Sequence, residues 1–161
     1  MTGRGTSLVW FTLLALLSMS SHSQQGVPNH GLTLGHEFIR PDSLNWVRSG
    51  GVQLAVLSGN PDKPGLFTIR LKVRDGYRVQ AHWHPQDESI TVIQGTFLMG
   101  MGDKFDPAAL EQLPTGSFAF MPKEMRHFAS CIGETIVQLH GMGPFVSNYV
   151  NPADDPEKKN P

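Results

Sequence analysis

Two histidines and a glutamate form the most chemically suggestive cluster in the sequence, in the pattern His82-x-His84-x3-Glu88. The residues on either side are rich in β-branched side chains and are bounded by turn glycines, which predicts strands. Because residues i and i+2 of a strand point to the same face, His82 and His84 would lie side by side, with Trp83 on the other face. Pro85 would end this strand, and Glu88 would open the next one beside the imidazoles. Two imidazoles and a carboxylate on one face make a partial metal site with an open position.

A fourth ligand is expected from a second segment, in which Gly116, Pro122 and His127 follow the spacing Gly-x5-Pro-x4-His. His127 would complete a site for one divalent transition metal. Imidazole and carboxylate donors suit iron, manganese, zinc, copper and nickel, so the identity of the ion stays open. The alternative is that these four residues are only packed polar groups. Burying three imidazoles and a carboxylate together without a metal would be costly, which favours the metal site.

The two segments resemble the motifs of the cupin superfamily. The first cupin motif, Gly-x5-His-x-His-x3–4-Glu-x6-Gly, is matched at every spacing by Gly76, His82, His84, Glu88 and Gly95. The second, Gly-x5-Pro-x-Gly-x2-His-x3-Asn, is matched by Gly116, Pro122 and His127. Glu124 stands where a glycine is usual, and Cys131 stands where an asparagine is usual. The resemblance implies a single-domain, all-β cupin fold, a double-stranded β-helix or jelly-roll barrel with the metal inside.

The hydrophobic pattern independently predicts an all-β protein, with about eight or nine short strands and almost no helix. The clearest alternation runs from Phe67 to Val73, with Phe67, Ile69, Leu71 and Val73 on one face. Residues 96–102 are expected to return as the second strand of a hairpin after Gly95. Separate strands are expected over residues 127–131, 135–140 and 145–150, and helical turns near residues 41–46 and 106–110. The apolar side chains expected in the core include Phe97, Met99, Phe118 and Phe120.

Four regions are expected along the 161 residues. Residues 1–23 have the short apolar run and small terminal residues of a signal peptide, with cleavage before Gln24. Residues 24–50 form a lead-in, residues 51–150 the barrel, and residues 151–161 a loose polar tail. Export to the periplasm or outside the cell follows, with no membrane association after cleavage. The alternative is an uncleaved N-terminal anchor.

The formal net charge of −1 gives no electrostatic case for nucleic acid as a partner. A small-molecule substrate or ligand is expected instead, and an exposed edge strand would favour a homodimer. Cys131 is the only cysteine, so no intrachain disulfide can form. Its thiol is either close to the metal or, as we favour, a small buried side chain.

Five further polar residues stand outside the proposed ligand set. Gln138 and His140 share one strand face and either line the barrel mouth or lie on the surface. Arg70 either clamps a carboxylate substrate or faces solvent, and its alternation with apolar neighbours favours solvent. His30 and His36 are expected to be surface or packing residues.

The leading functional hypothesis is a small-molecule metalloenzyme, with a dioxygenase as the first reaction to consider. The alternative is a cupin that captures a metal or small ligand without turnover. The spacing between His84 and Glu88 is one residue shorter than germins generally have, which disfavours an oxalate-acting enzyme. A zinc cupin of the anti-sigma type is also disfavoured, because those regulators are cytoplasmic and carry a second domain. An enzyme predicts a solvent-accessible metal, whereas a binding module predicts a closed site.

Overall fold

The computed structural model describes residues 37–49 and 51–159. The predicted signal peptide, most of the predicted lead-in, His30 and His36 lie outside the described residues. The elements follow in the order η1 (Pro41–Ser43), β1 (Val47–Ser49), β2 (Val52–Ser58), β3 (Gly65–Val73), β4 (Val79–Trp83), β5 (Glu88–Met101), η2 (Pro107–Ala109), β6 (Glu111–Pro114), β7 (Phe118–Met121), β8 (His127–Gly143), β9 (Asn148–Tyr149), η3 (Pro152–Asp154) and η4 (Pro156–Lys159). The prediction of an all-β protein is confirmed.

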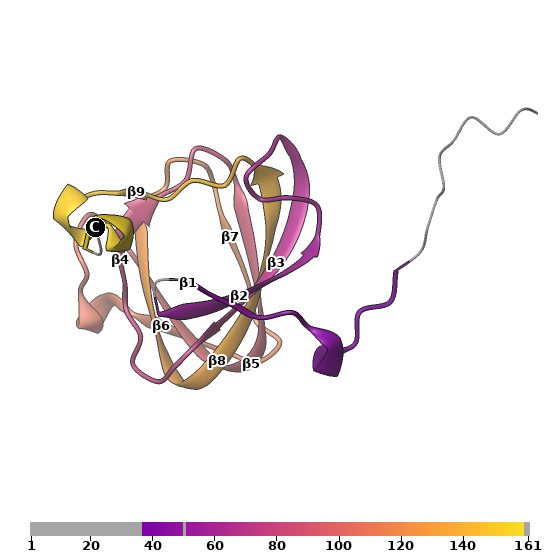
Figure 1. The fold of residues 1–161 in the computed structure, drawn as a ribbon. Coiled ribbons are helices and arrows are strands. Elements are labelled where there is room, and N and C mark those ends of the chain that lie inside the picture. Colours follow the sequence, from indigo (N-terminus) through magenta and orange to yellow (C-terminus); the bar gives the residue numbers. More distant parts are fainter. Residues whose placement is uncertain (1–36, 50, 160–161) are drawn as a thin grey trace, which may run out of the picture. The chain divides into compact units, whose positions relative to one another are not determined.

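The nine strands belong to one sheet, which curls into a barrel (Figure 1). One path through the sheet runs β1-β2-β3-β8-β4-β9, and β5 pairs with β6, β7 and β8. The two longest strands, β5 and β8, pair antiparallel from Glu88 opposite Gly141 to Met101 opposite His127. Two long strands wound together in this way make the jelly-roll barrel that the motifs predicted.

The hairpin predicted at Gly95 was wrong, because β5 runs through this residue without a turn. Gly95 has a φ of 81°, and a Cβ atom there would lie 2.5 Å from Thr135 Oγ1 on β8. The β5–β8 register shifts on both sides of Gln94, so Gly95 belongs to an irregularity at which the strand bends and continues. Residues 127–131 and 135–140, predicted as two strands, likewise both lie in β8.

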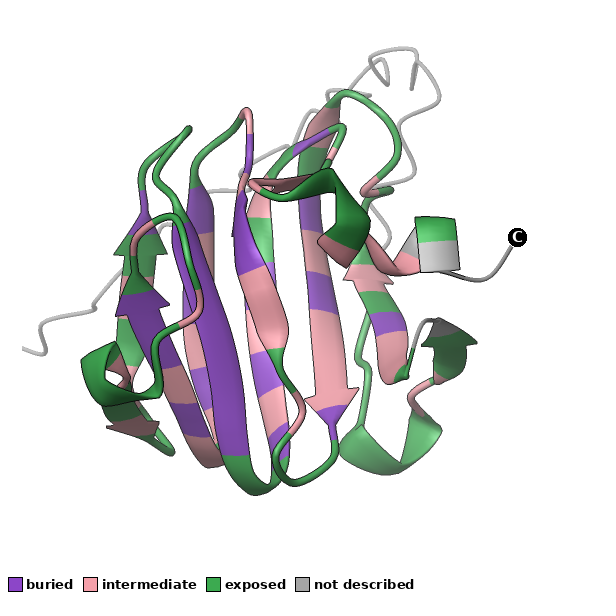
Figure 2. Ribbon diagram, turned by 90° about the vertical axis from the view of Figure 1, so that its left-hand side faces the viewer, coloured by how far each residue is buried: buried purple, intermediate pink, exposed green. Residues whose placement is uncertain are grey.

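The core lies on the inner face of the curled sheet, where the buried segments of the long strands gather (Figure 2). Phe97 and Met99 are buried there, as expected. Phe118 and Phe120 are 59% and 50% exposed, so their predicted place in the core was wrong. On β7 the neighbouring residue Met121 is the buried one, which leaves the two phenylalanines on the outer face.

The outer face also carries the polar side chains whose position was open. The Nε of Arg70 donates a hydrogen bond to Oε1 of Gln138 at 3.1 Å. His140 is exposed and alternates along β8 with the buried residue Leu139. The hypothesis that Gln138 and His140 line the barrel mouth is therefore wrong, and both lie on the outside.

The short helical segments complete the fold. The turns expected near residues 41–46 and 106–110 form as η1 and η2, and Asp106 Oδ1 accepts a hydrogen bond from the Ala108 amide at 2.9 Å. In the segment predicted to be a loose tail, η3 and η4 form two further turns. Within residues 37–49 and 51–159, no helix has the length and apolar character needed to cross a membrane.

Candidate metal centre

Strand pairing brings the three predicted histidine ligands together inside the barrel. His82 on β4 lies directly opposite His127, the first residue of β8, and the two ring centroids are 4.3 Å apart. His84 follows the end of β4, with its ring centroid 4.9 Å from that of His82 and 5.4 Å from that of His127. One ligand-capable atom from each histidine lies within 4.8 Å of the other two. These three residues could therefore bind one metal ion.

Glu88, the first residue of β5, points toward the same cluster. Its Oε2 atom is 3.7 Å from Nε2 of His84 and 3.5 Å from Nε2 of His127. The group of ligand atoms that all lie within 4.8 Å of one another comes from the three histidines and does not include Glu88. Glu88 therefore sits to one side of the histidines. Its place beside two imidazoles suits the role of a fourth ligand.

Backbone carbonyls orient all three imidazoles. Nδ1 of His82 lies 2.8 Å from the carbonyl oxygen of Gln80, Nδ1 of His84 lies 2.9 Å from that of Val146, and Nδ1 of His127 lies 3.0 Å from that of Met125. A carbonyl oxygen can only accept, so each neutral ring carries its proton on Nδ1. Each Nε2 then presents a lone pair, which is the form that metal-binding histidines take.

Burial keeps the proton off two of these rings, those of His82 and His84. It is the main cause that lowers the pKa of His82 to about 3, and the nearby imidazoles of His127 and His84 lower it further. Burial also lowers the pKa of His84, although the carboxylate of Glu88 opposes that effect. Both imidazoles are therefore neutral at neutral pH and available as ligands.

The donor set fits a mononuclear metal. His82, His84, Glu88 and His127 are between 2% and 6% exposed. Two of their polar atoms, Nε2 of His84 and Oε2 of Glu88, are buried without a hydrogen-bond partner. Unpartnered buried polar atoms are costly, and a shared cation would satisfy both. Two donors that each lie ~2.1 Å from one ion are ~3.0–4.2 Å apart, and the separations from Glu88 fall in that range.

A family model described as the ChrR cupin-like domain matches residues 34–146, which is most of the chain. The chain belongs to this family. The match confirms the cupin resemblance that the two motifs indicated. A comparison with curated proteins found no match.

Solved structures agree with this cupin fold. The polyketide cyclase RemF from Streptomyces resistomycificus is 16% identical, with a TM-score of 0.62, over 77% of this chain and 92% of that one. An RmlC-like cupin from Shewanella frigidimarina is 19% identical, with a TM-score of 0.54, over 67% of this chain and 91% of that one. At these identities the likeness shows the fold alone.

The family name also bears on the class of regulators that the sequence disfavoured. ChrR is named as an anti-sigma in a solved complex with SigE of Rhodobacter sphaeroides, which is 20% identical with a TM-score of 0.49 and covers 63% of this chain and 50% of that one. The family match, by its description alone, relates this chain to the cupin-like domain of ChrR. It assigns the domain family and no protein partner.

Two aromatic side chains pack against the histidines of this cupin and were not predicted as part of the site. The ring of Phe145 stacks on His84, with centroids 4.3 Å apart and an interplanar angle of 23°. The ring of Tyr149 lies 5.7 Å from that of His82. The sequence placed both in a last strand with no assigned role, because neither residue belongs to a cupin motif.

Cys131 lies outside the cluster of ligand atoms. Its Sγ donates a hydrogen bond to the carbonyl oxygen of Arg74 at 2.9 Å, and burial raises the pKa of the thiol. A buried, protonated thiol with a backbone partner supports the interpretation of Cys131 as a small buried side chain.

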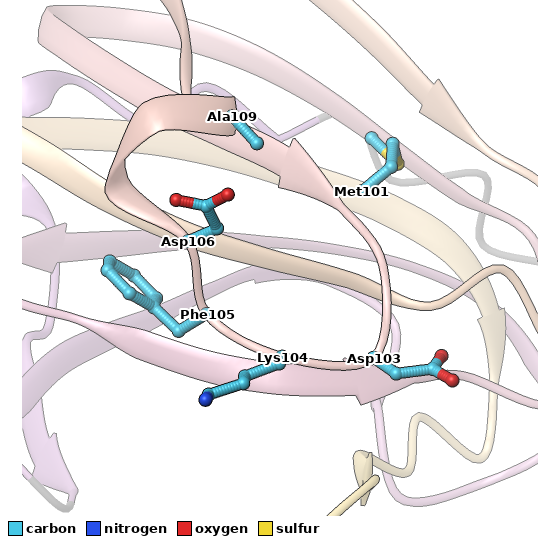
Figure 3. Close-up of a pocket in the computed structure, with 6 residues that line it drawn as sticks. All are labelled: Met101, Asp103, Lys104, Phe105, Asp106 and Ala109. Carbon is cyan, nitrogen blue, oxygen red and sulfur yellow. The ribbon is translucent and has the colours of Figure 1, made fainter.

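Two surface hollows flank the loop that follows β5. The first has a volume of about 510 Å³, and Figure 3 shows the side chains that line it: Met101, Asp103, Lys104, Phe105, Asp106 and Ala109. The second, of about 380 Å³, shares Asp103, Lys104 and Phe105 with the first. No histidine of the cluster lines either hollow. Asp103 is paired there with Arg126 at 2.8 Å.

Proposed function

We propose that this cupin is an exported metal protein in which His82, His84, His127 and Glu88 hold one divalent transition metal. The observation that carries the proposal is a buried cluster of three imidazoles, each with Nδ1 on a backbone carbonyl. Two of them, those of His84 and His127, direct Nε2 toward Oε2 of Glu88, which has no hydrogen-bond partner. Export is proposed from the apolar N-terminal run of the sequence.

We further propose that the metal serves chemistry on a small molecule, with dioxygenase activity as the first reaction to test. When bound, such an ion supplies Lewis-acid or redox chemistry. The protein contributes the orientation of the ligands through the three carbonyls, and it buries all four ligand side chains. Four protein ligands leave one or two positions on a five- or six-coordinate ion.

The burial of the ligands supports a second candidate function, in which the cupin holds its metal or a small ligand without turnover. A closed site is what such a binding module requires, and none of the four side chains is more than 6% exposed. The two candidates differ in one measurable property, which is whether water exchanges at the metal.

The experiment starts with the protein purified from the periplasm without an affinity tag, beside the His82→Ala/His127→Ala double variant. The proposal predicts about one metal per chain in the wild type and loss of that metal in the variant. Equal metal content in the two proteins, or none in the wild type after reconstitution with each candidate ion, would refute the metal centre. A mass that does not correspond to a chain beginning at Gln24 would contradict cleavage at the predicted site.

Manganese-loaded protein then separates the two candidate functions. Enhanced relaxation of bulk water protons would indicate exchangeable water at the ion and support the enzyme. Oxygen uptake by the iron-loaded protein in the presence of a small organic substrate would identify a dioxygenase. Absence of water exchange would support the binding module.

A further inference from the structure

Residues 144–150 form a segment that crosses the candidate metal centre, which we call the C-terminal strap. Its first part is attached to the loop before β3, because the Phe145 amide donates to the carbonyl oxygen of Pro61 at 2.7 Å. Its end is attached to β4, because the Val150 amide donates to the carbonyl oxygen of Ala81 at 2.9 Å. Between these points lies β9, which pairs with β4 and lies beside it in Figure 1.

The strap makes two contacts with the ring of His84. The carbonyl oxygen of Val146 holds Nδ1 at 2.9 Å, and the ring of Phe145 covers one face at a centroid distance of 4.3 Å. The hydrogen bond fixes one edge of the imidazole, and the stacked ring fixes its plane. Together the contacts leave Nε2 directed toward Oε2 of Glu88.

His84 needs this support more than the other two histidines do. His82 and His127 lie within β4 and β8, where strand pairing fixes their backbone opposite each other. His84 follows the last residue of β4 and precedes β5, so no strand pairing includes it. Its carbonyl oxygen is held by the Glu124 amide, but that bond leaves the ring free to rotate. The orientation of the imidazole therefore depends on the strap.

We infer that Phe145 is a positioning residue for the metal ligand His84, and that its ring determines how tightly the centre holds its ion. The inference rests on the proposed metal centre. Groups that orient a ligand typically change metal affinity about tenfold to a hundredfold when they are lost. Phe145 touches no proposed metal position itself and acts through the imidazole on which it stacks.

The test compares Phe145→Leu with the wild type in the full chain, with zinc and cobalt(II) as probes. Leucine keeps much of the apolar volume but has no flat ring face. We expect the dissociation constant for zinc, measured by competition with a chromophoric chelator, to rise about tenfold or more. The visible absorption spectrum of bound cobalt should also change, because the His84 donor is no longer held in one orientation.

Three further variants separate positioning from general stability. Phe145→Tyr keeps the ring and the face that stacks on His84, and residue 145 is only half-buried, so wild-type affinity and spectrum are expected. Val146→Ala removes an exposed side chain from the same strap and keeps the carbonyl, so it should also behave as the wild type. Val137→Ala lowers stability through the buried core and should leave zinc affinity unchanged.

The outcomes distinguish failure of this inference from failure of the proposed function. If the wild type binds metal and Phe145→Leu has the same zinc affinity and cobalt spectrum, the positioning role is overturned and the metal centre stands. An equal loss of affinity in Val137→Ala would also overturn it, because general destabilisation would then explain the effect. A wild type that binds neither ion would overturn both.

Discussion

The backbone amide of Glu124 donates a hydrogen bond to the backbone carbonyl oxygen of His84, with nitrogen and oxygen 2.7 Å apart. The bond joins the turn of the second motif to a ligand of the first. Glu124 has a φ of 64°, in the left-handed region that a glycine adopts easily. The glutamate therefore takes the conformation of the usual glycine, and one residue later Met125 supplies the carbonyl that orients His127.

Glu124→Gly should leave metal content unchanged and change the free energy of unfolding by less than about 1 kcal/mol. The relief of left-handed strain is offset by the larger conformational entropy of glycine in the unfolded chain. Glu124→Val should lower the free energy of unfolding by about 1–2 kcal/mol, because a β-branched side chain fits poorly at positive φ. Urea unfolding measures both, with Lys123→Val as the exposed control. Equal stability of Glu124→Val and the control would contradict the left-handed turn.

His84→Ala should lose nearly all bound metal and keep a folded barrel. The variant removes one imidazole donor, while the buried residues of the core cluster lie on β3, β5, β7 and β8. His140→Ala is the matched control, because it removes an exposed imidazole from the outer face. Elemental analysis and far-UV circular dichroism report metal and fold. Full metal content in His84→Ala would show that the site is wrongly assigned.

Glu88→Gln should have opposite effects on the metal-free and metal-bound protein. The buried Oε2 has no hydrogen-bond partner, so a neutral amide should raise the free energy of unfolding of the metal-free chain by about 1–3 kcal/mol. The same change removes a charged ligand and should weaken metal binding by about tenfold or more. Thermal unfolding with and without zinc measures both effects.

Glu111→Gln, which changes an exposed carboxylate on β6, is the control for that comparison. A Glu88→Gln variant that binds metal as tightly as the wild type would exclude Glu88 as a ligand. The three histidines would then be the whole protein contribution to the site.

The metal-free protein should become less stable as the pH falls below about 6.5. The ordinary pKa of a histidine is 6.5, but burial lowers that of His82 to about 3 in the folded protein. Between these values the unfolded chain binds a proton that the folded chain does not, so acid favours unfolding. Above the ordinary value both states are neutral at this residue, and its contribution does not change with pH.

Urea unfolding of the metal-free protein between pH 8 and pH 5 measures this dependence. His82→Gln removes the titrating ring from the same position, so the fall in stability toward pH 5 should be smaller in that variant. Identical pH dependence in the two proteins would mean that His82 is not buried in its neutral form.

The fold class and the grouping of His82, His84 and Glu88 could be predicted from the sequence because both depend on local geometry. Alternation along a strand places His82 and His84 on one face wherever that strand lies, and the following turn brings Glu88 back toward them. The spacing around His127 added a distant ligand only because it resembled a second motif. Buried ligands leave a pattern in the sequence when their spacing is set by one strand and one turn.

Only the tertiary structure decided which face of β7 meets the core, whether Gly95 turns or bends the chain, and what holds the ring of His84. Alternation separates Phe118 and Phe120 from Met121 but does not say which set points inward. A glycine with positive φ suits a hairpin and a bulge equally, and the pairing of β5 with β8 selects the bulge. The carbonyl of Val146 lies 62 residues from His84 along the chain. Every residue has the same backbone carbonyl whatever its side chain, so the sequence does not mark this one. A contact between a side chain and a distant backbone group leaves no mark in the sequence, so it becomes visible only when the chain is folded.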